Sequence, residues 1–171
     1  MIKIREECPE DAPAIRSIIK RAFGQPQEAD LVEMLRRGCD RLVSLVAMDE
    51  GLPVGHVLFS PAVIEAPGGV IQGMGLAPVA VLPEFQRRGV GSALIREGIE
   101  KLRSASCPFI IVLGHADYYP RFGFESASRR NIRPQWEGIP DESFMVLILD
   151  EPAMRSVSGV ARYRKEFDDA I

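Results

Sequence analysis

The sequence predicts a mixed α/β fold, in which an antiparallel front half is followed by a parallel strand–helix–strand unit. Two observations carry this prediction. Apolar runs joined by short turns fill residues 41–82, as in consecutive hairpins. An amphipathic helix over Gly89–Ser104 then separates two apolar strands, and a crossover of this kind within one sheet is parallel and right-handed.

The N-terminal part reads as a strand followed by two helices. Ile2 and Ile4 alternate with charged residues, as in a half-buried strand. A first helix begins near Asp11 and ends at residues 24–26, and a second covers Glu28–Arg37 and stops at Gly38. Apolar residues at helical spacing give these helices inward faces, namely Ala14, Ile15, Ile18, Ile19, Ala22 and Phe23, then Leu31, Met34 and Leu35.

Three strands follow, over Arg41–Met48, Val54–Ile64 and Val70–Leu82, with turns at residues 49–51 and 66–69. Pro61 interrupts the second of these strands. The third contains glycine and proline, at which we expect a bulge or a lost ladder bond, at Gly73, Gly75 and Pro78.

Beyond the amphipathic helix, Phe109–Leu113 is a continuous apolar run and is expected to be a buried strand. A short helix is expected over Ala116–Phe122, a strand from Phe124, and a last strand over Phe144–Leu149. The tail from Glu151 is polar and mixed, and no element is assigned to it.

Composition fits a single globular domain, with a core over about residues 1–150 and a C-terminal tail over 151–171. Hydrophobic residues make up 46% and charged residues 26% of the 171, which is ordinary for such a domain. The net charge of −3 is spread along the chain. This excludes a basic stripe that would hold nucleic acid and mildly favours a cationic substrate such as an amine.

The cysteines are Cys8, Cys39 and Cys107, an odd number without a CxxC pair. They predict neither a disulfide framework nor a metal site, and reduced thiols suit a cytosolic compartment. The N-terminus has no apolar signal core, and no apolar run approaches the length of about 18 residues that spans a bilayer. A cytoplasmic protein without membrane association is therefore expected.

The most informative segment is VAVLPEFQRRGVGSALI, residues 79–95. A strand ends at Leu82, a short loop carries Gln86, Arg87 and Arg88, and glycines then open a helix. The first backbone N–H groups of a helix lack helical partners and lie at the positive end of its dipole. A pyrophosphate can rest there where no Cβ blocks its approach, and nearby arginines add charge.

Two other phosphate-binding patterns fit this segment badly. A P-loop needs Lys-Ser/Thr after its final glycine, whereas Ser92-Ala93 follows Gly91. A dinucleotide fingerprint needs a third glycine and an acid about 20 residues on, where this chain has Leu94 and Phe109. The third phosphate-binding pattern, Q/R-x-x-G-x-G/A, is matched by residues 86–91.

These residues resemble the GNAT superfamily of acetyltransferases, and most closely its bacterial YhbS-like branch of predicted N-acetyltransferases. The resemblance rests on APVAVLPEFQRRGVGSALI at residues 77–95 and YYPRFGF at 118–124, which are specific, and on GHVLFSP at 55–61 and the N-terminal strand and helix, which are weaker. It covers most of residues 1–150. It implies the GNAT fold, with a mixed sheet of about six to seven strands, splayed in the middle and flanked by about four helices.

The resemblance also implies acetyl-CoA as cofactor and a primary amine as acceptor, with no metal. Pantetheine would pair with the backbone of the strand end, and pyrophosphate would rest on the helix start. The implied cofactor-binding residues are Val79, Ala80, Val81, Gln86, Arg87, Arg88, Gly89, Val90, Gly91 and Ser92. A backbone N–H near Val81 would stabilise the oxyanion, and Tyr119 would act as general acid toward the leaving thiolate. Tyr118 is the alternative acid.

The base and the acceptor site stay open. The acid that some family members carry on the strand before the turn is missing from Met74–Leu82. Residues that could replace it are Glu28, Glu33, His56 and His115, as could a water chain; for His56, a position in the core is the stronger reading. The loop 24–30 between the first two helices could attract an ammonium group through Glu28 and Asp30, or could be solvated.

Alternative functions are a non-catalytic acyl-CoA-binding or regulatory module and a transferase for a longer acyl-CoA. The splayed sheet of the family often leaves a strand edge free, so a homodimer is compatible with the sequence.

Overall fold

The computed structural model describes residues Met1–Ala170. Within them, nine strands form one mixed sheet in the order β1-β2-β3-β4-β5-β8-β6, with β7 and β9 beside this path. The chain divides into two compact units. The first unit holds residues 1–59 and 77–101 and the chain from Lys165 onward, and the second holds residues 60–76 and 102–164.

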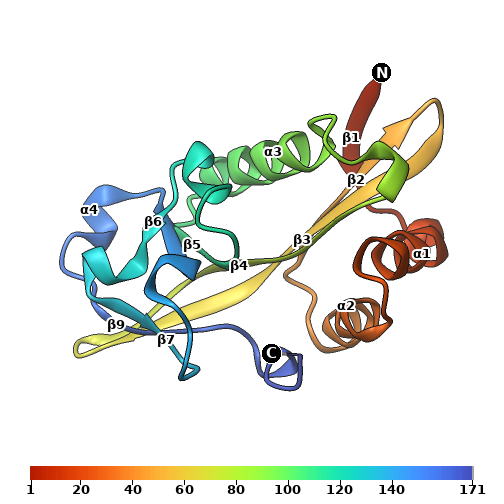
Figure 1. Cartoon of the computed structure of the whole chain (residues 1–171). Helices are drawn as coiled ribbons and strands as arrows, with labels where there is room; N and C mark the ends of the chain where they lie inside the picture. Colours follow the sequence, from red (N-terminus) through yellow and green to blue (C-terminus); the bar gives the residue numbers. More distant parts are fainter. Residues whose placement is uncertain (171) are drawn as a thin grey trace. The chain divides into compact units, whose positions relative to one another are not determined.

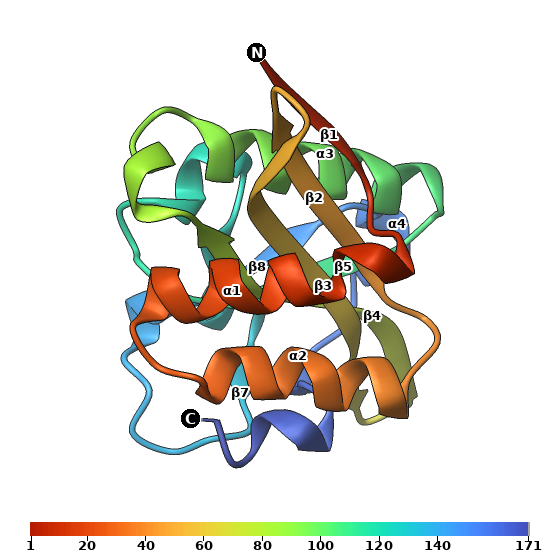
Figure 2. The ribbon, with the colours of Figure 1, turned by 90° about the vertical axis from the view of Figure 1, so that its right-hand side faces the viewer.

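The first unit contains an antiparallel ribbon with helices on both faces. β1 (Ile2–Glu6) pairs with β2 (Val43–Asp49), which pairs with the front of β3 (Leu52–Ala66). α1 (Ala12–Phe23) and α2 (Gln27–Gly38) lie side by side on one face of this ribbon, and α3 (Val90–Ser104) lies on the other (Figures 1 and 2). The predicted strand, helices and hairpin are thereby confirmed.

Two glycines let α3 approach β3 closely. A Cβ on Gly55 would lie 3.0 Å from Val90 and 3.1 Å from Leu94, and a Cβ on Gly98 would lie 2.1 Å from the ring of Phe59. Gly55 and Phe59 share one face of β3, because alternate residues of a strand point the same way. β3 therefore has Gly55 opposite large side chains of α3, and α3 has Gly98 opposite the ring of Phe59 in β3.

The second unit is built on β5 (Phe109–Leu113), which is buried as predicted. β5 pairs with β8 (Phe144–Ile148), which also pairs with β6 (Glu125–Ser126). The end of β3 pairs with β9 (Gly159–Arg162), and β9 pairs with β7 (Ile132–Pro134), as the lower part of Figure 1 shows. α4 covers Glu151–Met154. Short 3-10 turns in the described chain include Pro9–Asp11, Pro83–Phe85, Tyr119–Phe122, Ala127–Arg130, Asp141–Ser143 and Lys165–Phe167.

β4 (Gly69–Val81) runs through both units and is the strand on which the predicted splay depends. It pairs in parallel with β5 only through Met74–Leu76 opposite Ile110–Val112. Gly75 lies in this stretch and Gly73 directly before it, and aromatic rings take the place of their side chains: a Cβ would lie 2.6 Å from Phe109 at Gly73 and 2.4 Å from Tyr163 at Gly75. Pro78 then has no N–H to donate to a ladder.

The structure corrects several details. Phe23 and Met34 were expected to face inward but are 41% and 37% exposed; they lie at the margins of apolar stripes whose centres are Ile15, Ile19 and Leu35. Pro61 does not interrupt β3. The short helix expected from Ala116 is a 3-10 turn beginning at Tyr119. The additional strands are short, and one of them, β9, lies in the tail to which no element was assigned.

The mixed α/β class and the α-helix content of the described residues agree with the prediction. No helix within residues 1–170 is long and apolar enough to cross a membrane.

The close contact between Gly98 and Phe59 gives a stability prediction. Alanine normally favours a helix over glycine by about 1 kcal/mol, but Gly98→Ala should lower the free energy of unfolding by about 1–3 kcal/mol because the added methyl group overpacks the core. Urea unfolding measures this. Gly68→Ala is the control, since nothing lies within 4 Å of its added Cβ. A stabilised Gly98→Ala protein would contradict the packing described.

Candidate active site

The end of β4 is held by contacts on both of its edges. The N–H of Leu82 donates to the carbonyl of Val54 in β3 at 2.9 Å. Successive peptide groups of an extended strand point to opposite edges, so the N–H and C=O of Val81 point away from β3. The side-chain amide of Gln86 donates to this Val81 carbonyl at 2.9 Å. Gln86 thus fixes the strand end from the loop that follows it.

The loop after β4 places two arginines at the surface. A 3-10 turn over Pro83–Phe85 is tied to α1 by an ion pair of 2.9 Å between Glu84 and Arg21. Arg87 has a positive φ of 63°, and the guanidinium of Arg88 lies 5.5 Å from the ring centre of Phe85. Both arginines are exposed, so they can meet an anion in front of the helix start.

Gly89 immediately precedes α3 and has the features that the phosphate-binding prediction requires. Its φ of +82° is rarely adopted by L side chains, and nothing lies within 4 Å of the position of a Cβ. The N–H of Ala93 bonds to the Gly89 carbonyl at 3.0 Å, so the preceding N–H groups of the first turn have no helical acceptor. Gly89, Gly91 and Ser92 are at least partly exposed, whereas Ala80 and Val90 are buried and can contribute only backbone groups.

Tyr119 lies in the second unit, on the turn that follows β5. Its backbone N–H and that of Tyr118 bond to the His115 carbonyl at 3.4 and 3.1 Å. The ring packs edge-on to Phe124, at 5.7 Å between centres, and covers Gly114, where a Cβ would lie 2.4 Å from the ring. Burial raises the pKa of Tyr119 to about 12, and Tyr118 adds to this. The phenol is therefore protonated at neutral pH.

The two predicted acceptor-site residues lie in different units. Glu28 is half-buried at the start of α2 and accepts hydrogen bonds of 3.0 and 2.8 Å from the side chain of Gln25. His115 is exposed at the end of β5, just before the turn that carries Tyr119. The acids around Glu28 are engaged, because Asp30 and Glu33 lie 2.9 and 3.1 Å from Arg16.

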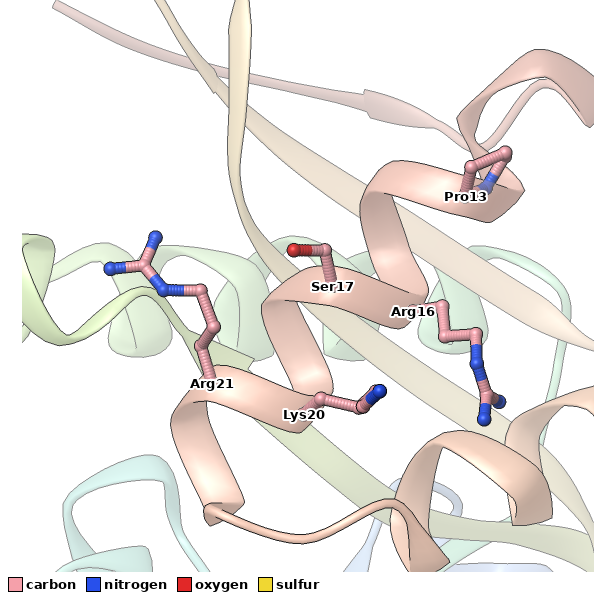
Figure 3. A pocket seen from close by; sticks show the side chains of 5 residues that line it. All are labelled: Pro13, Arg16, Ser17, Lys20 and Arg21. Carbon is pink, nitrogen blue, oxygen red and sulfur yellow. The ribbon is translucent and has the colours of Figure 1, made fainter.

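A hollow of about 340 Å³ on the outer side of α1 is unsuited to a cationic amine. Figure 3 shows its lining side chains, all from one helix: Pro13, Arg16, Ser17, Lys20 and Arg21. The lining carries Lys20 and two arginines, which are paired with acids outside it, and includes no acidic side chain that would attract an ammonium group.

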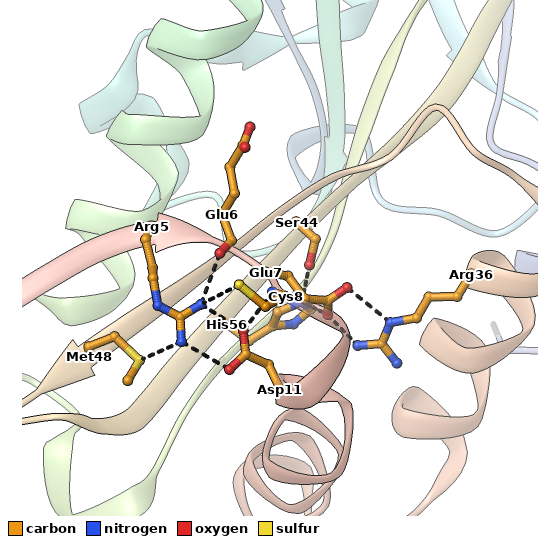
Figure 4. Close-up of polar contacts among 9 residues, drawn as sticks. All are labelled: Arg5, Glu6, Glu7, Cys8, Asp11, Arg36, Ser44, Met48 and His56. Atoms are coloured by element: carbon orange, nitrogen blue, oxygen red, sulfur yellow. Dashed lines mark hydrogen bonds and ion pairs between the residues drawn. The ribbon is translucent and has the colours of Figure 1, made fainter.

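His56 is the buried member of a partly exposed polar cluster between the β-ribbon and α2 (Figure 4). It is 0% exposed, with Nε2 at 2.8 Å from Ser44 Oγ and 4.0 Å from Glu7. Glu7 also bonds to Arg36, while the Asp11 carboxylate pairs with Arg5 at 2.7 and 3.0 Å. An imidazole without solvent exposure cannot contact a substrate amine, so the reading of His56 as a core residue is confirmed.

The sequence profile of the acetyltransferase (GNAT) domain matches residues 3–127, and the chain belongs to this family of acetyltransferases. It is 36% identical over 166 residues to the uncharacterized N-acetyltransferase YhbS of Escherichia coli strain K12, which covers 96% of this chain and 98% of that protein. It is 46% identical over 134 residues to the uncharacterized N-acetyltransferase YjhQ of the same strain, covering 77% and 74%.

Solved structures of acetyltransferases of this family also match the fold of this chain. The crystal structure of Escherichia coli YhbS in complex with CoA matches with a TM-score of 0.89 at 35% identity, over 98% of this chain and 92% of that one. A GNAT family acetyltransferase from Brucella melitensis in complex with acetyl-CoA matches with a TM-score of 0.79 at 34% identity, over 98% and 99%. The predicted family and fold are confirmed.

Two contacts that hold candidate site residues in place were not predicted from the sequence. The bond from Gln86 to Val81 was not foreseen, although a glutamine at the family motif was the signal for it. The need for Gly114 was also missed; a glycine directly after a buried strand and five residues before a tyrosine could have suggested a close ring contact.

The buried state of His56 gives a pH prediction. Burial, with Arg36 adding, lowers the pKa of His56 from 6.5 to about 3. Between these values the unfolded chain binds a proton that the folded chain does not, so stability is complete above pH 6.5 and falls as the pH drops. His56→Gln should remove about 1.4 kcal/mol per pH unit from this slope. Urea unfolding from pH 7 to pH 4.5 measures it.

The exposed His115 provides the matched control. His115→Gln replaces the chain's other histidine at an exposed position, and its slope of unfolding free energy against pH is measured beside that of His56→Gln. A slope for His56→Gln identical to that of the unmodified protein would contradict the buried neutral imidazole.

Proposed function

We propose that this protein transfers the acetyl group of acetyl-CoA to a primary amine, by direct attack in a ternary complex. The observation that carries the proposal is the geometry at the start of α3, where Gly89 has a positive φ and open space beside it, and Arg87 and Arg88 are exposed in the preceding loop. The CoA and acetyl-CoA in the crystallised relatives support the same cofactor for this chain.

The residues of the first unit suit the cofactor. The pyrophosphate would be held by the backbone of Arg88–Ser92, where the positive end of the helix dipole and the first N–H groups of the helix favour an anion. The strand end Val79–Val81 would pair with pantetheine as an added strand does. Glycine is needed at position 89 because a side chain there would fill the space in front of these N–H groups.

The acetyl donor supplies a thioester whose carbonyl accepts the amine and whose sulfur leaves as a thiolate. We propose that the N–H of Val81 stabilises the negative charge on the carbonyl oxygen. This N–H is directed by the strand and its neighbouring carbonyl is held by Gln86, so it needs no reorganisation during the reaction. Preorganised donors of this kind contribute about 3–4 kcal/mol.

We propose that Tyr119 acts as general acid toward the leaving sulfur. Its phenol, with a pKa of about 12, is a weaker acid by about 3.5 pKa units than a free thiol. The proton therefore stays closer to the phenol oxygen, and the assistance takes the form of a hydrogen bond to the developing thiolate. Gly114 and Phe124 fix the ring in place for this role.

The contacts of the side chains argue against two of the four candidates for the base that deprotonates the amine. His56 is buried, and Glu33 is paired with Arg16. Glu28 and His115 stay as the proposed substrate-side residues, because Glu28 is partly exposed and His115 is exposed. We also propose a cytoplasmic location, which the thiol state of Cys8, Cys39 and Cys107 supports.

The first experiment combines thermal unfolding with acetyl-CoA and a thiol-release assay over a panel of amines. Acetyl-CoA should raise the unfolding temperature. Its binding to the folded state adds about 2.7 kcal/mol of stability at a hundredfold excess over Kd. One class of amine should then release CoA. Binding without release for any amine would favour a non-catalytic module, release only with a longer acyl-CoA would change the donor, and no binding would refute the proposal.

Gly89→Glu tests whether the pyrophosphate of acetyl-CoA binds at the start of α3. The carboxylate should raise the Kd for acetyl-CoA at least about tenfold, because it places a side chain and a negative charge before the helix start. Gly51→Glu is a matched control: its φ of +81° and open surroundings resemble those of Gly89, but it lies in the β2–β3 turn. Both variants should lose similar stability, and equal Kd values for the two would exclude the assigned anion site.

Tyr119→Phe tests the acid. With the amine identified by the panel, kcat should fall about a hundredfold while the KM for acetyl-CoA changes little, because the hydroxyl acts on the leaving group. Thiol release under saturating substrates measures kcat. A loss that follows Tyr118→Phe instead would move the role to Tyr118, and an unaltered kcat in both variants would remove it from the turn.

A further inference from the structure

Arg121 lies on the turn that carries Tyr119 and is not among the cofactor-binding or substrate-side residues. Its guanidinium carbon lies 4.4 Å from the centre of the Tyr118 ring. Its Nε donates to the main-chain carbonyl of Tyr118 at 2.9 Å, and its backbone N–H donates to the same oxygen at 3.4 Å. Arg121 therefore contacts both the ring and the main chain of Tyr118, although the arginine itself is exposed.

The backbone of the turn favours this contact. Residues three apart eclipse one another in a 3-10 helix, so a side chain at position 121 can reach back over position 118. Pro120 fixes its own φ in the first part of the turn. At the end, Gly123 has a φ of 102° and its N–H donates to the Pro120 carbonyl at 3.0 Å. The turn is therefore defined at both ends.

The ring of Tyr118 also packs on other rings of the turn. Its centre lies 5.1 Å from that of Tyr119, with 82° between the planes, and 5.3 Å from that of Phe122, with 77°. Such edge-to-face pairs are favourable. Phe124 packs on Tyr119 in the same way at 5.7 Å. Tyr119 therefore packs edge-on against two rings, and Arg121 contacts one of these two.

We propose that Arg121 is a positioning residue that holds the ring of Tyr118 against Tyr119 and so fixes the phenol of the general acid. This inference rests on the proposed function, because it assumes that the Tyr119 hydroxyl acts on the leaving sulfur. An acid must lie within hydrogen-bond reach of the reacting atom, so a ring that can leave its position assists less often. The residues whose contacts carry the inference all belong to the second unit.

Steady-state kinetics of Arg121→Met, with the amine identified by the panel, tests this role, since methionine keeps a long side chain and removes the charge. A contact can shift the position of a ring by no more than its own free energy, and a cation–π contact at an exposed site is worth about a factor of two to five. We therefore expect kcat to fall about three- to fivefold, while the KM for acetyl-CoA stays within about twofold. Arg121→Lys keeps a cation for the ring and should recover part of kcat.

Two further variants separate positioning from a general loss of structure. Arg129→Met replaces an exposed arginine of the turn Ala127–Arg130 in the same unit and should keep kcat. Tyr119→Phe keeps the ring and removes the hydroxyl, so adding Arg121→Met to it should lower kcat less than about 1.5-fold. An equal fall in both backgrounds would overturn the inference, as would an unaltered kcat in Arg121→Met alone.

Fluorine NMR of the protein labelled with 3-fluorotyrosine gives a readout that does not depend on activity. The chain has three tyrosines, and replacing each with phenylalanine assigns its resonance. Arg121→Met should shift the resonances of Tyr118 and Tyr119, whereas Arg129→Met should leave them in place. An unshifted Tyr119 resonance in Arg121→Met would overturn the inference. An unaltered kcat in Tyr119→Phe, with the shifts present, would instead refute the acid role in the proposed function, and the inference with it.

Discussion

The candidate cofactor site depends on the close approach of α3 to β3. A helix normally lies about 10 Å from a sheet because side chains separate the two, but here Gly55 and Gly98 remove the side chains at two points of contact. Val90, the first residue of α3, is one of the groups that occupies the space above Gly55. The packing therefore fixes the start of the helix, and with it the backbone N–H groups that we propose bind phosphate.

β4 carries a second constraint, because the proposed cofactor site requires a strand that is paired at its beginning and unpaired at its end. Its sequence meets both demands. Gly73 and Gly75 accept the rings of Phe109 and Tyr163 while the strand is still paired, and Pro78 removes a ladder donor just beyond the last registered pair. Gln86 then holds the final carbonyl from the loop. Local backbone chemistry and tertiary contacts agree on where the pairing stops.

The sequence was informative where the evidence for an element is local. The 3.6-residue period of α3, the apolar run of β5 and the motif at residues 86–91 each lie within one short segment. The helix and the strand were confirmed by the structure, and the family that the motif indicated was confirmed by the comparisons. The single-domain assignment and the individual site roles stay predictions. Phe23 and Met34 were misjudged because periodicity shows the centre of a buried stripe better than its margins.

β9 and Tyr163 could not be found in this way, since a strand of four residues has no clear period and one of its partner strands, β3, lies about a hundred residues away along the chain. The same reason explains why the glycines of β4 were read as a bulge or lost bond rather than as sockets for rings. A glycine shows that space is needed, but only the folded chain shows which group fills it. At Gly75 that group is the phenol of Tyr163, whose hydroxyl also contacts the main chain of two strands. The position of the tyrosine therefore depends on the glycine.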